Sequence, residues 1–191
     1  MRRAGILAVL SVACVSLVFA ATAIAKHRSF NGPLRLQVLG LEPGRRFGLD
    51  QVYNGFGCSG KDESPELRIT GVPAAAKSLA ITIFDPDAPT QSGWWHWLVY
   101  DLPTTTTHLA ENASATGLPQ GAAQGPNDFG TAGYGGVCPP AGSPAHHYRV
   151  TVWALNVSAL GAPSGASAAF ISYLIEADTI AHRTVVVKYS R

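Results

Sequence analysis

The stretch FDPDAPTQSGWWHW, residues Phe84–Trp97, decides the fold because it joins two apolar runs through a rigid polar turn. The flanking runs, Ser78–Phe84 and Leu98–Tyr100, have the composition of strands that are buried on at least one face. Pro86 and Pro89 fix their own φ angles and hold the residues before them extended. Carboxylates, tryptophans and a histidine therefore lie on a rigid turn at the end of a core strand, which predicts a pocket. The alternative is a plain Pro-Asp loop with an aromatic cluster packed beside it.

Other apolar runs along the chain predict a mainly β protein. Tyr148–Ala154 alternates large apolar residues with smaller or polar ones, as a strand with one core face does. One helix is expected late, at about residues 165–182, with Ser164 or Ser167 as its N-cap. Many strands followed by one helix favour an antiparallel β-sandwich with helical decoration. The expected strands are Leu34–Leu39, Glu66–Thr70, Ser78–Phe84, Trp97–Tyr100, Tyr148–Leu155 and Thr184–Tyr189.

Residues 1–25 have the anatomy of a secretory signal peptide. Arg2 and Arg3 form a basic start, Ile6–Ala21 is apolar, and small residues end the segment at Ala25. Export to the periplasm, the cell envelope or the medium, with cleavage near Ala25, is therefore expected. A lipoprotein signal at Cys14, a twin-arginine signal and an uncleaved anchor are the alternatives. Removing residues 1–25 from the 191 leaves 166, a length that suits a single domain at residues 26–191.

The charge balance gives no support to nucleic-acid binding. Of the 14 Lys and Arg residues, two lie in the leader, which leaves 12 against 12 Asp and Glu. A local basic group could still contact anionic lipid headgroups, or could be a solvated tail and loop. Its members are Lys26, His27, Arg28, Arg35, Arg45 and Arg46.

Two cysteines, Cys58 and Cys138, remain after the leader. An even number in an exported chain favours a disulfide over a metal site or a nucleophile. That bridge would close a loop of about 80 residues and stabilise the fold by roughly 4–5 kcal/mol in the chain-entropy model. Two free thiols are the alternative.

Several motifs resemble the phosphatidylethanolamine-binding protein (PEBP) family, and especially its bacterial YbhB/YbcL or Raf kinase inhibitor-like branch. Asp-Pro-Asp-Ala-Pro from Asp85, followed by Trp-Trp-His-Trp, is similar to the first signature of the family. Further matches occur in order between Leu34 and Arg191. They are Gly55–Gly60, Ser64–Leu67, Asp128–Gly130, Gly133–Gly136, Pro139-Pro140 and His146–Tyr148.

The resemblance implies a fold and a ligand class. The family fold has a large central β-sheet, a smaller sheet and peripheral helices. Its cavity takes small anionic groups such as phosphate, phosphorylethanolamine or a phospholipid headgroup. The family needs no cofactor there and no metal. Carried over by position, the ligand-binding residues are Asp85, Asp87, Pro89, Trp94, His96, Gly136, Pro139, Pro140, His146 and Tyr148.

The residue types in this set fit an anion site. A histidine beside a carboxylate is expected to have a raised pKa and to become a cationic donor. Backbone N–H groups at Gly135 and Gly136 could add donors, and Trp94 could form a wall for an amine. A disulfide would lock the two pocket loops together. A metal held by Asp85, Asp87, His96 and His146 is the alternative, although no close histidine pair supports it.

Three features limit what the resemblance implies. Val137 stands where many relatives have proline, which removes a rigid residue from that turn, and His147 stands where an arginine is usual, which removes a fixed charge beside the cavity. The sequence has no Gly-x-Ser-x-Gly nucleophile elbow, and we expect a binding protein rather than an enzyme.

The alternative functions are an interaction or inhibitor module that acts through its outer surface, with an unknown protein partner, and a hydrolase. Kinase inhibition, associated with eukaryotic members, does not suit an exported chain.

Overall fold

The computed structural model describes residues 32–191. The leader expected at residues 1–25, and the basic residues Lys26, His27 and Arg28, lie outside the described residues. Among the residues that are described, no helix has the length and apolar character needed to cross a membrane.

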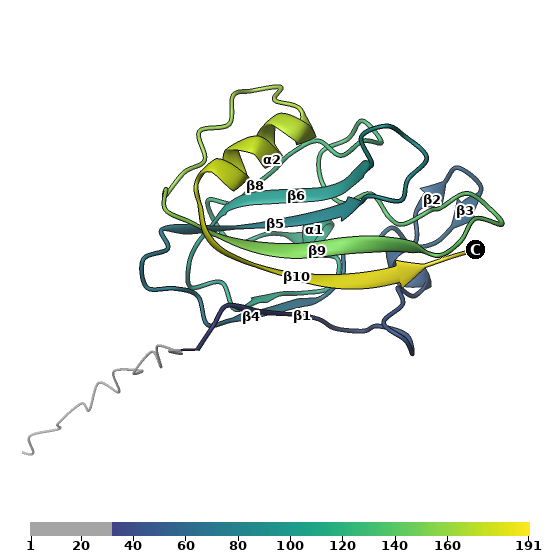
Figure 1. Cartoon of the computed structure of the whole chain (residues 1–191), viewed down its shortest axis with the longest axis horizontal. Helices are drawn as coiled ribbons and strands as arrows, with labels where there is room; N and C mark the ends of the chain where they lie inside the picture. Colours follow the sequence, from purple (N-terminus) through teal and green to yellow (C-terminus); the bar gives the residue numbers. More distant parts are fainter. Residues whose placement is uncertain (1–31) are drawn as a thin grey trace, which may run out of the picture.

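A five-stranded antiparallel sheet forms the larger layer, in the order β10-β9-β5-β6-β8. Figure 1 shows its long strands side by side, with β5 and β9 at the centre and β10 at one edge. The bounds of the strands are β5 Ser78–Asp85, β6 Trp94–Leu102, β8 Ala123–Gln124, β9 His146–Leu155 and β10 Thr179–Tyr189.

A smaller antiparallel sheet, in the order β1-β4-β7, forms the second layer. A two-stranded hairpin of β2 and β3 lies apart from both sheets in pairing, close to the C-terminus (Figure 1). The remaining elements are β1 Arg35–Val38, the 3₁₀ helix η1 Leu49–Gln51, β2 Asn54–Gly55, β3 Cys58–Ser59, β4 Leu67–Thr70, β7 His108–Leu109, and the helices α1 Ala113–Thr116 and α2 Ala168–Ala177.

The main hydrophobic core lies between the two sheets. Ile81 and Ile83 of β5 and Val150 and Val152 of β9 are fully buried in it, together with Leu67 and Ile69 of β4. Because side chains alternate along a strand, residues at even positions of β9 face this core and those at odd positions face outward. A second cluster covers part of the outer face, where Ile171 and Ile175 of α2 pack on Leu98. The mainly β, two-sheet architecture expected from the sequence is therefore confirmed.

The late helix is shorter than predicted. It spans Ala168–Ala177 rather than residues 165–182, and Ser167 caps it by accepting a hydrogen bond from the Phe170 N–H (3.2 Å). The Thr179 hydroxyl donates to the Ile175 carbonyl (2.6 Å), and β10 begins at Thr179. β-Branched residues favour strands, and pairing with β9 along the whole of β10 outweighs helical spacing over residues 179–182.

The expected strands are all present, but two of them extend farther toward the predicted pocket. β6 begins at Trp94 instead of Trp97, and β9 begins at His146 instead of Tyr148. Both candidate histidines, His96 and His146, therefore lie within strands of the large sheet. Their backbone positions are fixed by the sheet ladder, so the candidate site rests on rigid elements.

Candidate functional site

The β5–β6 hairpin positions the first group of candidate residues. Asp85 is the last residue of β5 and pairs in register with Trp94, the first residue of β6. Gly93 closes the connection with φ +71°, and a Cβ there would lie 2.3 Å from the Phe84 ring. Only glycine fits both this backbone conformation and this contact. The turn therefore fixes where the Asp85 carboxylate points.

A buried hydrogen bond joins the ends of two strands. The Nδ1 atom of His146 on β9 lies 2.7 Å from Oδ2 of Asp85, and the side chains are only 6% and 4% exposed. The other carboxylate oxygen, Oδ1, accepts the backbone N–H of Asp87 (2.9 Å). Because a carboxylate only accepts, Nδ1 of His146 carries the proton, and Nε2 is the ring nitrogen available to a ligand.

His96 is fixed by the loop that contains Gly135. Its Nδ1 lies 2.7 Å from the Gly135 carbonyl, and the Gly135 N–H donates to the His96 carbonyl (2.8 Å). The ring is 3% exposed. Burial lowers the pKa of His96, although the Gly135 carbonyl and the Asp85 carboxylate oppose this shift. The expected rise in pKa is therefore wrong for His96, because desolvation outweighs the nearby charge.

The backbone of the Gly135-Gly136 loop is already hydrogen bonded. The Gly135 N–H is used by His96, and the Gly136 N–H donates to the Asp62 carboxylate. A Cβ at Gly136 would lie 2.3 Å from the backbone nitrogen of Tyr53, so this position requires the smallest residue. The expectation that these N–H groups face a ligand is not met, since both hold the loop in place.

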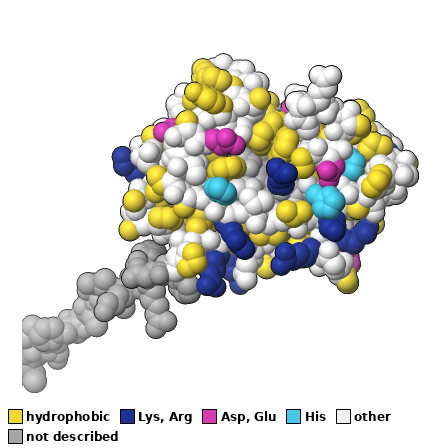
Figure 2. All heavy atoms as spheres, in the orientation of Figure 1, with side chains coloured by type: hydrophobic (Ala, Val, Ile, Leu, Met, Phe, Trp, Pro, Cys, Tyr) yellow, Lys and Arg dark blue, Asp and Glu magenta, His cyan; other side chains and the backbone are white. Residues whose placement is uncertain are grey.

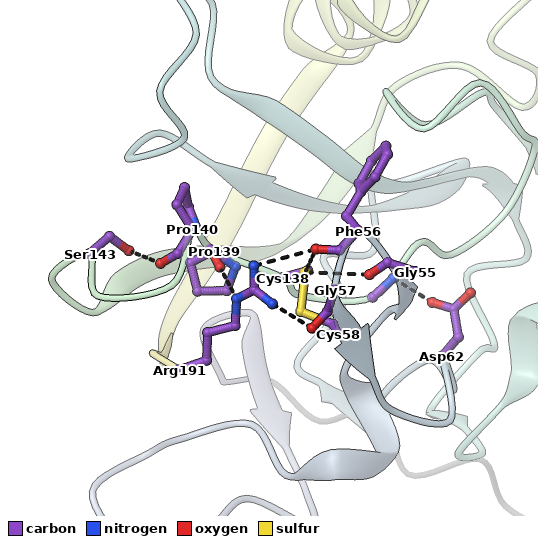
Figure 3. Close-up of a disulfide and its surroundings, with 11 residues drawn as sticks. Gly55, Phe56, Gly57, Cys58, Asp62, Cys138, Pro139, Pro140, Ser143 and Arg191 are labelled. Atoms are coloured by element: carbon purple, nitrogen blue, oxygen red, sulfur yellow. Dashed lines mark hydrogen bonds between the residues drawn. A yellow bond between two sulfur atoms is a disulfide. The ribbon is translucent and has the colours of Figure 1, made fainter.

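A disulfide joins Cys58 of β3 to Cys138, which confirms the pairing expected from the sequence. Figure 3 shows the guanidinium of Arg191 beside it, between the Pro139 loop and the β2–β3 turn. Arg191 donates to the carbonyls of Pro139 (2.7 Å), Gly57 (2.6 Å) and Phe56 (3.3 Å). The C-terminal residue and the disulfide thus tie two loops of the candidate site together.

These elements enclose a cavity of about 190 Å³. It is smaller than the roughly 300–1,000 Å³ typical of sites that enclose drug-sized ligands, so it suits a headgroup-sized group. Its wall is made by Phe56, Asp85, Ala88, Pro89, Thr90, Trp94, His96, Phe129, Cys138, Pro139, Pro140 and His146.

Seven of the ten residues expected at the site lie in this wall. Asp87, Gly136 and Tyr148 do not. Asp87 points to His147, whose Nδ1 lies 2.7 Å from Asp87 Oδ2. Tyr148 is fully buried behind the wall, with its ring centroid 5.2 Å from that of His96. Burial and the Asp85 charge raise the pKa of Tyr148 well above its usual value.

Sequence reasoning missed several wall residues, chiefly Phe56 and Phe129. The two rings lie 5.7 Å apart, and Tyr53 stacks on Phe129 at 4.1 Å. Phe56 is 71% exposed and has φ +50°, an unusual conformation for an aromatic residue. Phe56 and Phe129 lie in the motifs Gly55–Gly60 and Asp128–Gly130, but the packing of two rings across the fold leaves no local pattern in the sequence.

One polar group at the wall has no partner. The indole N–H of Trp94 is buried and makes no hydrogen bond with any described residue. Because a buried donor without a partner costs free energy, such a group calls for an explanation, and a ligand acceptor supplies one. Within residues 32–191, no group of three or more His, Cys, Asp or Glu side chains is arranged to hold a metal ion.

His147 and Arg149 lie on the outer face of the large sheet, opposite His146 and Tyr148. The pleat of β9 is regular, with buried residues at 146, 148 and 150 and exposed ones at 147 and 149. Neither side chain lines the cavity. The histidine at position 147 therefore changes the charge outside the cavity and not within it.

Comparison with known proteins places the chain in a family. A family model for phosphatidylethanolamine-binding protein matches residues 42–190. YbcL of Escherichia coli K12 is 45% identical over 152 residues, which cover 78% of this chain and 83% of YbcL. YbhB of the same organism is 39% identical over 141 residues, covering 73% of this chain and 89% of YbhB.

Solved structures give the same result. The crystal structure of E. coli YbcL, a member of the PEBP family, has a TM-score of 0.80 at 42% identity, and covers 84% of this chain and 99% of that one. A PEBP homologue from Chlamydia trachomatis has a TM-score of 0.69 at 29% identity, with 83% and 98% covered. The chain therefore belongs to the phosphatidylethanolamine-binding protein family.

Proposed function

We propose that the cavity binds a small anionic ligand, of which the headgroup of a phospholipid, phosphorylethanolamine, is the representative form. The observation that supports this most directly is the set of polar groups in an otherwise apolar wall: the Asp85–His146 pair, His96 and the unpaired indole N–H of Trp94. Convergent polar groups in a small aromatic cavity orient a ligand and make its binding specific.

The two histidines make anion binding dependent on protons. Each uses Nδ1 as a donor to a protein oxygen, which leaves Nε2 with a lone pair in the neutral ring. A phosphate oxygen needs a donor, so either the phosphate carries a proton or a histidine gains one. Since burial already lowers the pKa of His96, an anion that binds beside it must raise that pKa. Affinity should therefore fall as pH rises.

The aromatic wall explains how an ethanolamine amine would be accepted. Phe56, Trp94 and Phe129 line one part of the cavity, and the rings of Trp94 and Phe129 meet edge to face at 5.2 Å. Aromatic faces attract ammonium groups, with about 0.5–2 kcal/mol at each site. Phosphate contacts the histidine and indole donors in this arrangement, and the amine contacts the rings.

Calorimetric titration of residues 26–191 tests the proposal. Phosphorylethanolamine, inorganic phosphate and ethanolamine are titrated at pH 6 and pH 8. We expect saturable binding of the first, weaker binding of phosphate alone, and lower affinity at pH 8. His96→Asn and Asp85→Asn should weaken binding, and Arg183→Gln, far from the wall, should not. Absence of heat from wild type at millimolar phosphorylethanolamine would refute the headgroup assignment.

Binding without turnover is the second part of the proposal. The only hydroxyl side chain in the cavity wall, Thr90, donates to the Gly93 carbonyl (2.6 Å), and Cys138 is held in the disulfide. These contacts leave the described wall without a free hydroxyl or thiol nucleophile. Phosphorus NMR of phosphorylethanolamine incubated with the protein should show no new resonance over hours. Appearance of inorganic phosphate that depends on His96 would establish a hydrolase instead.

We also propose that the chain is exported and works at a membrane surface. Backbone bonds from Phe47 and Lys188 hold Arg45, Arg46 and Lys188 together at the end of β10. Figure 2 shows basic side chains gathered along the lower edge of the molecule. Clustered basic residues attract anionic lipid, by about 1 kcal/mol each near the surface.

Two measurements address export and membrane contact. The mass of the protein recovered from cells should correspond to a chain that begins at Lys26, and a mass that includes residues 1–25 would contradict cleavage. Residues 26–191 should sediment with vesicles that contain anionic lipid at low salt and be released at high salt. Equal binding to neutral vesicles would contradict an electrostatic contact.

A further inference from the structure

The outer face of the large sheet carries a second cavity, of about 330 Å³, which we call the outer-sheet groove. It lies on the opposite face of β9 from the anion cavity, because Arg149, Thr151 and Trp153 line it and His146 and Tyr148 face inward. The two cavities share no residue. The groove is thus a separate place on the molecule where a ligand could bind.

The sheet register arranges the groove in rows. Thr82 of β5, Thr151 of β9 and Thr184 of β10 lie directly opposite one another and form a central row of hydroxyls. Two residues farther along the strands, Phe84 pairs with Arg149 on one side and with Trp95 on the other. In the opposite direction, Trp153 pairs with His182. A hydroxyl floor therefore lies between two aromatic ends.

The hydroxyl floor keeps hydrogen-bonding capacity for a ligand. Thr82 Oγ1 accepts the indole N–H of Trp153 (2.9 Å), so its own O–H remains able to donate. Thr151 and Thr184 share one hydrogen bond (2.9 Å), so one of the two hydroxyls also has a free O–H. Thr82 and Thr151 are only 2% and 4% exposed, so the half-buried Thr184 is the hydroxyl of the row that is most accessible to a ligand.

The aromatic ends provide flat apolar surfaces on each side of that line. The rings of Phe84 and Trp95 lie 4.4 Å apart, and those of Trp153 and His182 lie 5.1 Å apart. At about 3.3 Å for each residue along a strand, the two ends are roughly 13 Å apart at the backbone.

The charges around the groove are balanced. Arg149 of β9 and Glu176 of α2 both line it, both are exposed, and neither forms a salt bridge among the described residues. Figure 2 shows hydrophobic side chains in the hollow below α2, with basic, acidic and histidine side chains around them. One positive and one negative group give no net attraction for a strongly charged ligand. Both are instead suited to bind neighbouring hydroxyl groups.

We propose that the outer-sheet groove binds a neutral saccharide. A sugar ring has an apolar C–H face that packs on aromatic rings and a rim of hydroxyls that donate and accept hydrogen bonds. In the groove, Trp153 and Phe84 pack on the apolar face of the sugar, and the threonine row forms hydrogen bonds with its hydroxyl groups. Arg149 and Glu176 hold hydroxyls at the edges. A simple apolar ligand would cover the threonine row without pairing its free O–H groups.

Titration by ¹H–¹⁵N NMR of residues 26–191 tests the assignment with three probes, cellotetraose, maltotetraose and chitotetraose, at millimolar concentrations. Saturating shifts are expected with at least one probe, and they should include the indole resonance of Trp153. Arg149→Gln and Thr184→Val should each weaken that binding by about tenfold, equivalent to ~1.4 kcal/mol. Thr184→Val is isosteric and Arg149→Gln shortens an exposed side chain, so folding should be retained.

Two control variants make the result specific. Arg183→Gln removes the same charge one position from His182, on the other face of β10, and should leave saccharide binding unchanged. His96→Asn alters the anion cavity and should also have no effect. The proposal is overturned if none of the three probes binds, if Arg149→Gln and Thr184→Val bind as wild type does, or if His96→Asn alone abolishes binding.

Discussion

The carboxylate of Asp85 holds two strands and the turn that follows one of them. Its Oδ2 lies 2.7 Å from Nδ1 of His146 on β9, and its Oδ1 accepts the Asp87 N–H at 2.9 Å. Both side chains are almost fully removed from water. Loss of one partner would leave the other buried without compensation, and this makes the pair sensitive to substitution.

Two substitutions of Asp85 should therefore distinguish the effect of its charge from that of its hydrogen bonds. Asp85→Ala removes both hydrogen bonds and should destabilise the fold by about 3 kcal/mol. Asp85→Asn keeps an acceptor for the Asp87 N–H and should cost clearly less. Urea unfolding followed by tryptophan fluorescence measures both. Equal losses for the two variants would mean that the carboxylate charge, and not its hydrogen bonding, stabilises this corner.

The buried His96 should make stability depend on pH in a defined direction. Burial holds its pKa in the folded protein below the ordinary value of 6.5. Below about pH 6.5 the unfolded chain binds a proton that the folded protein does not, so stability falls as pH decreases through that window. Above the unfolded pKa of His96 the ring is neutral in both states, so stability no longer changes with pH through this group. Below its folded pKa the ring is protonated in both states, and stability is again independent of pH through this group.

His96→Asn isolates this contribution, because an amide can still donate to the Gly135 carbonyl. The stability difference between wild type and variant should grow in favour of wild type as pH rises from 5 to 7. Urea unfolding at a series of pH values measures it. A difference that stays constant over this range, or changes in the other direction, would show that His96 is not held neutral by burial.

The disulfide should contribute strongly to stability. Its cysteines are 80 residues apart in sequence, for which chain entropy predicts about 4–5 kcal/mol. Cys58→Ala combined with Cys138→Ala should lower the urea midpoint accordingly. The affinity for phosphorylethanolamine should also fall, because the Pro139 loop and the β2–β3 turn would no longer be linked covalently. Wild type treated with reductant serves as the matched comparison. An unchanged midpoint would show that Arg191 alone is enough to hold the two loops.

Phe56 should lower the stability of the fold and increase the affinity of the cavity for its ligand. It and Gly57 form a two-residue turn between β2 and β3 with φ +50° and +78°, as a type I′ turn requires. Asparagine adopts this conformation more readily than phenylalanine, so Phe56→Asn should stabilise the fold by about 0.5–1 kcal/mol. The same change removes an aromatic side chain from the cavity wall and should weaken phosphorylethanolamine binding.

Thermal unfolding and calorimetry on the same preparation measure the two effects. Phe56→Tyr, which keeps the ring and the backbone demand, is the control and should behave as wild type. If Phe56→Asn lowers stability while binding is unchanged, the exposed ring has a structural role and is not a ligand contact.

Local patterns in the sequence were enough for the strands and for part of the site. Apolar runs located β5 and much of β10, alternation located β9, and an even cysteine count anticipated the bridge between Cys58 and Cys138. The helix boundary was wrong because residues 179–182 have helical spacing and β-branched side chains at once. Pairing with β9 decided between them, and pairing is not visible in one segment.

The sequence by itself determined where six of the ten strands in the described residues lie and which motifs identify the family, because both depend on neighbours in the chain. Only the tertiary structure decided that the Gly135 and Gly136 N–H groups are occupied and that His96 is held neutral. The tertiary structure alone placed Phe56 beside Phe129 and aligned the threonine row on the outer face of the large sheet. Burial and hydrogen-bond partners come from segments far apart in the chain, so they are fixed only when the sheets pack.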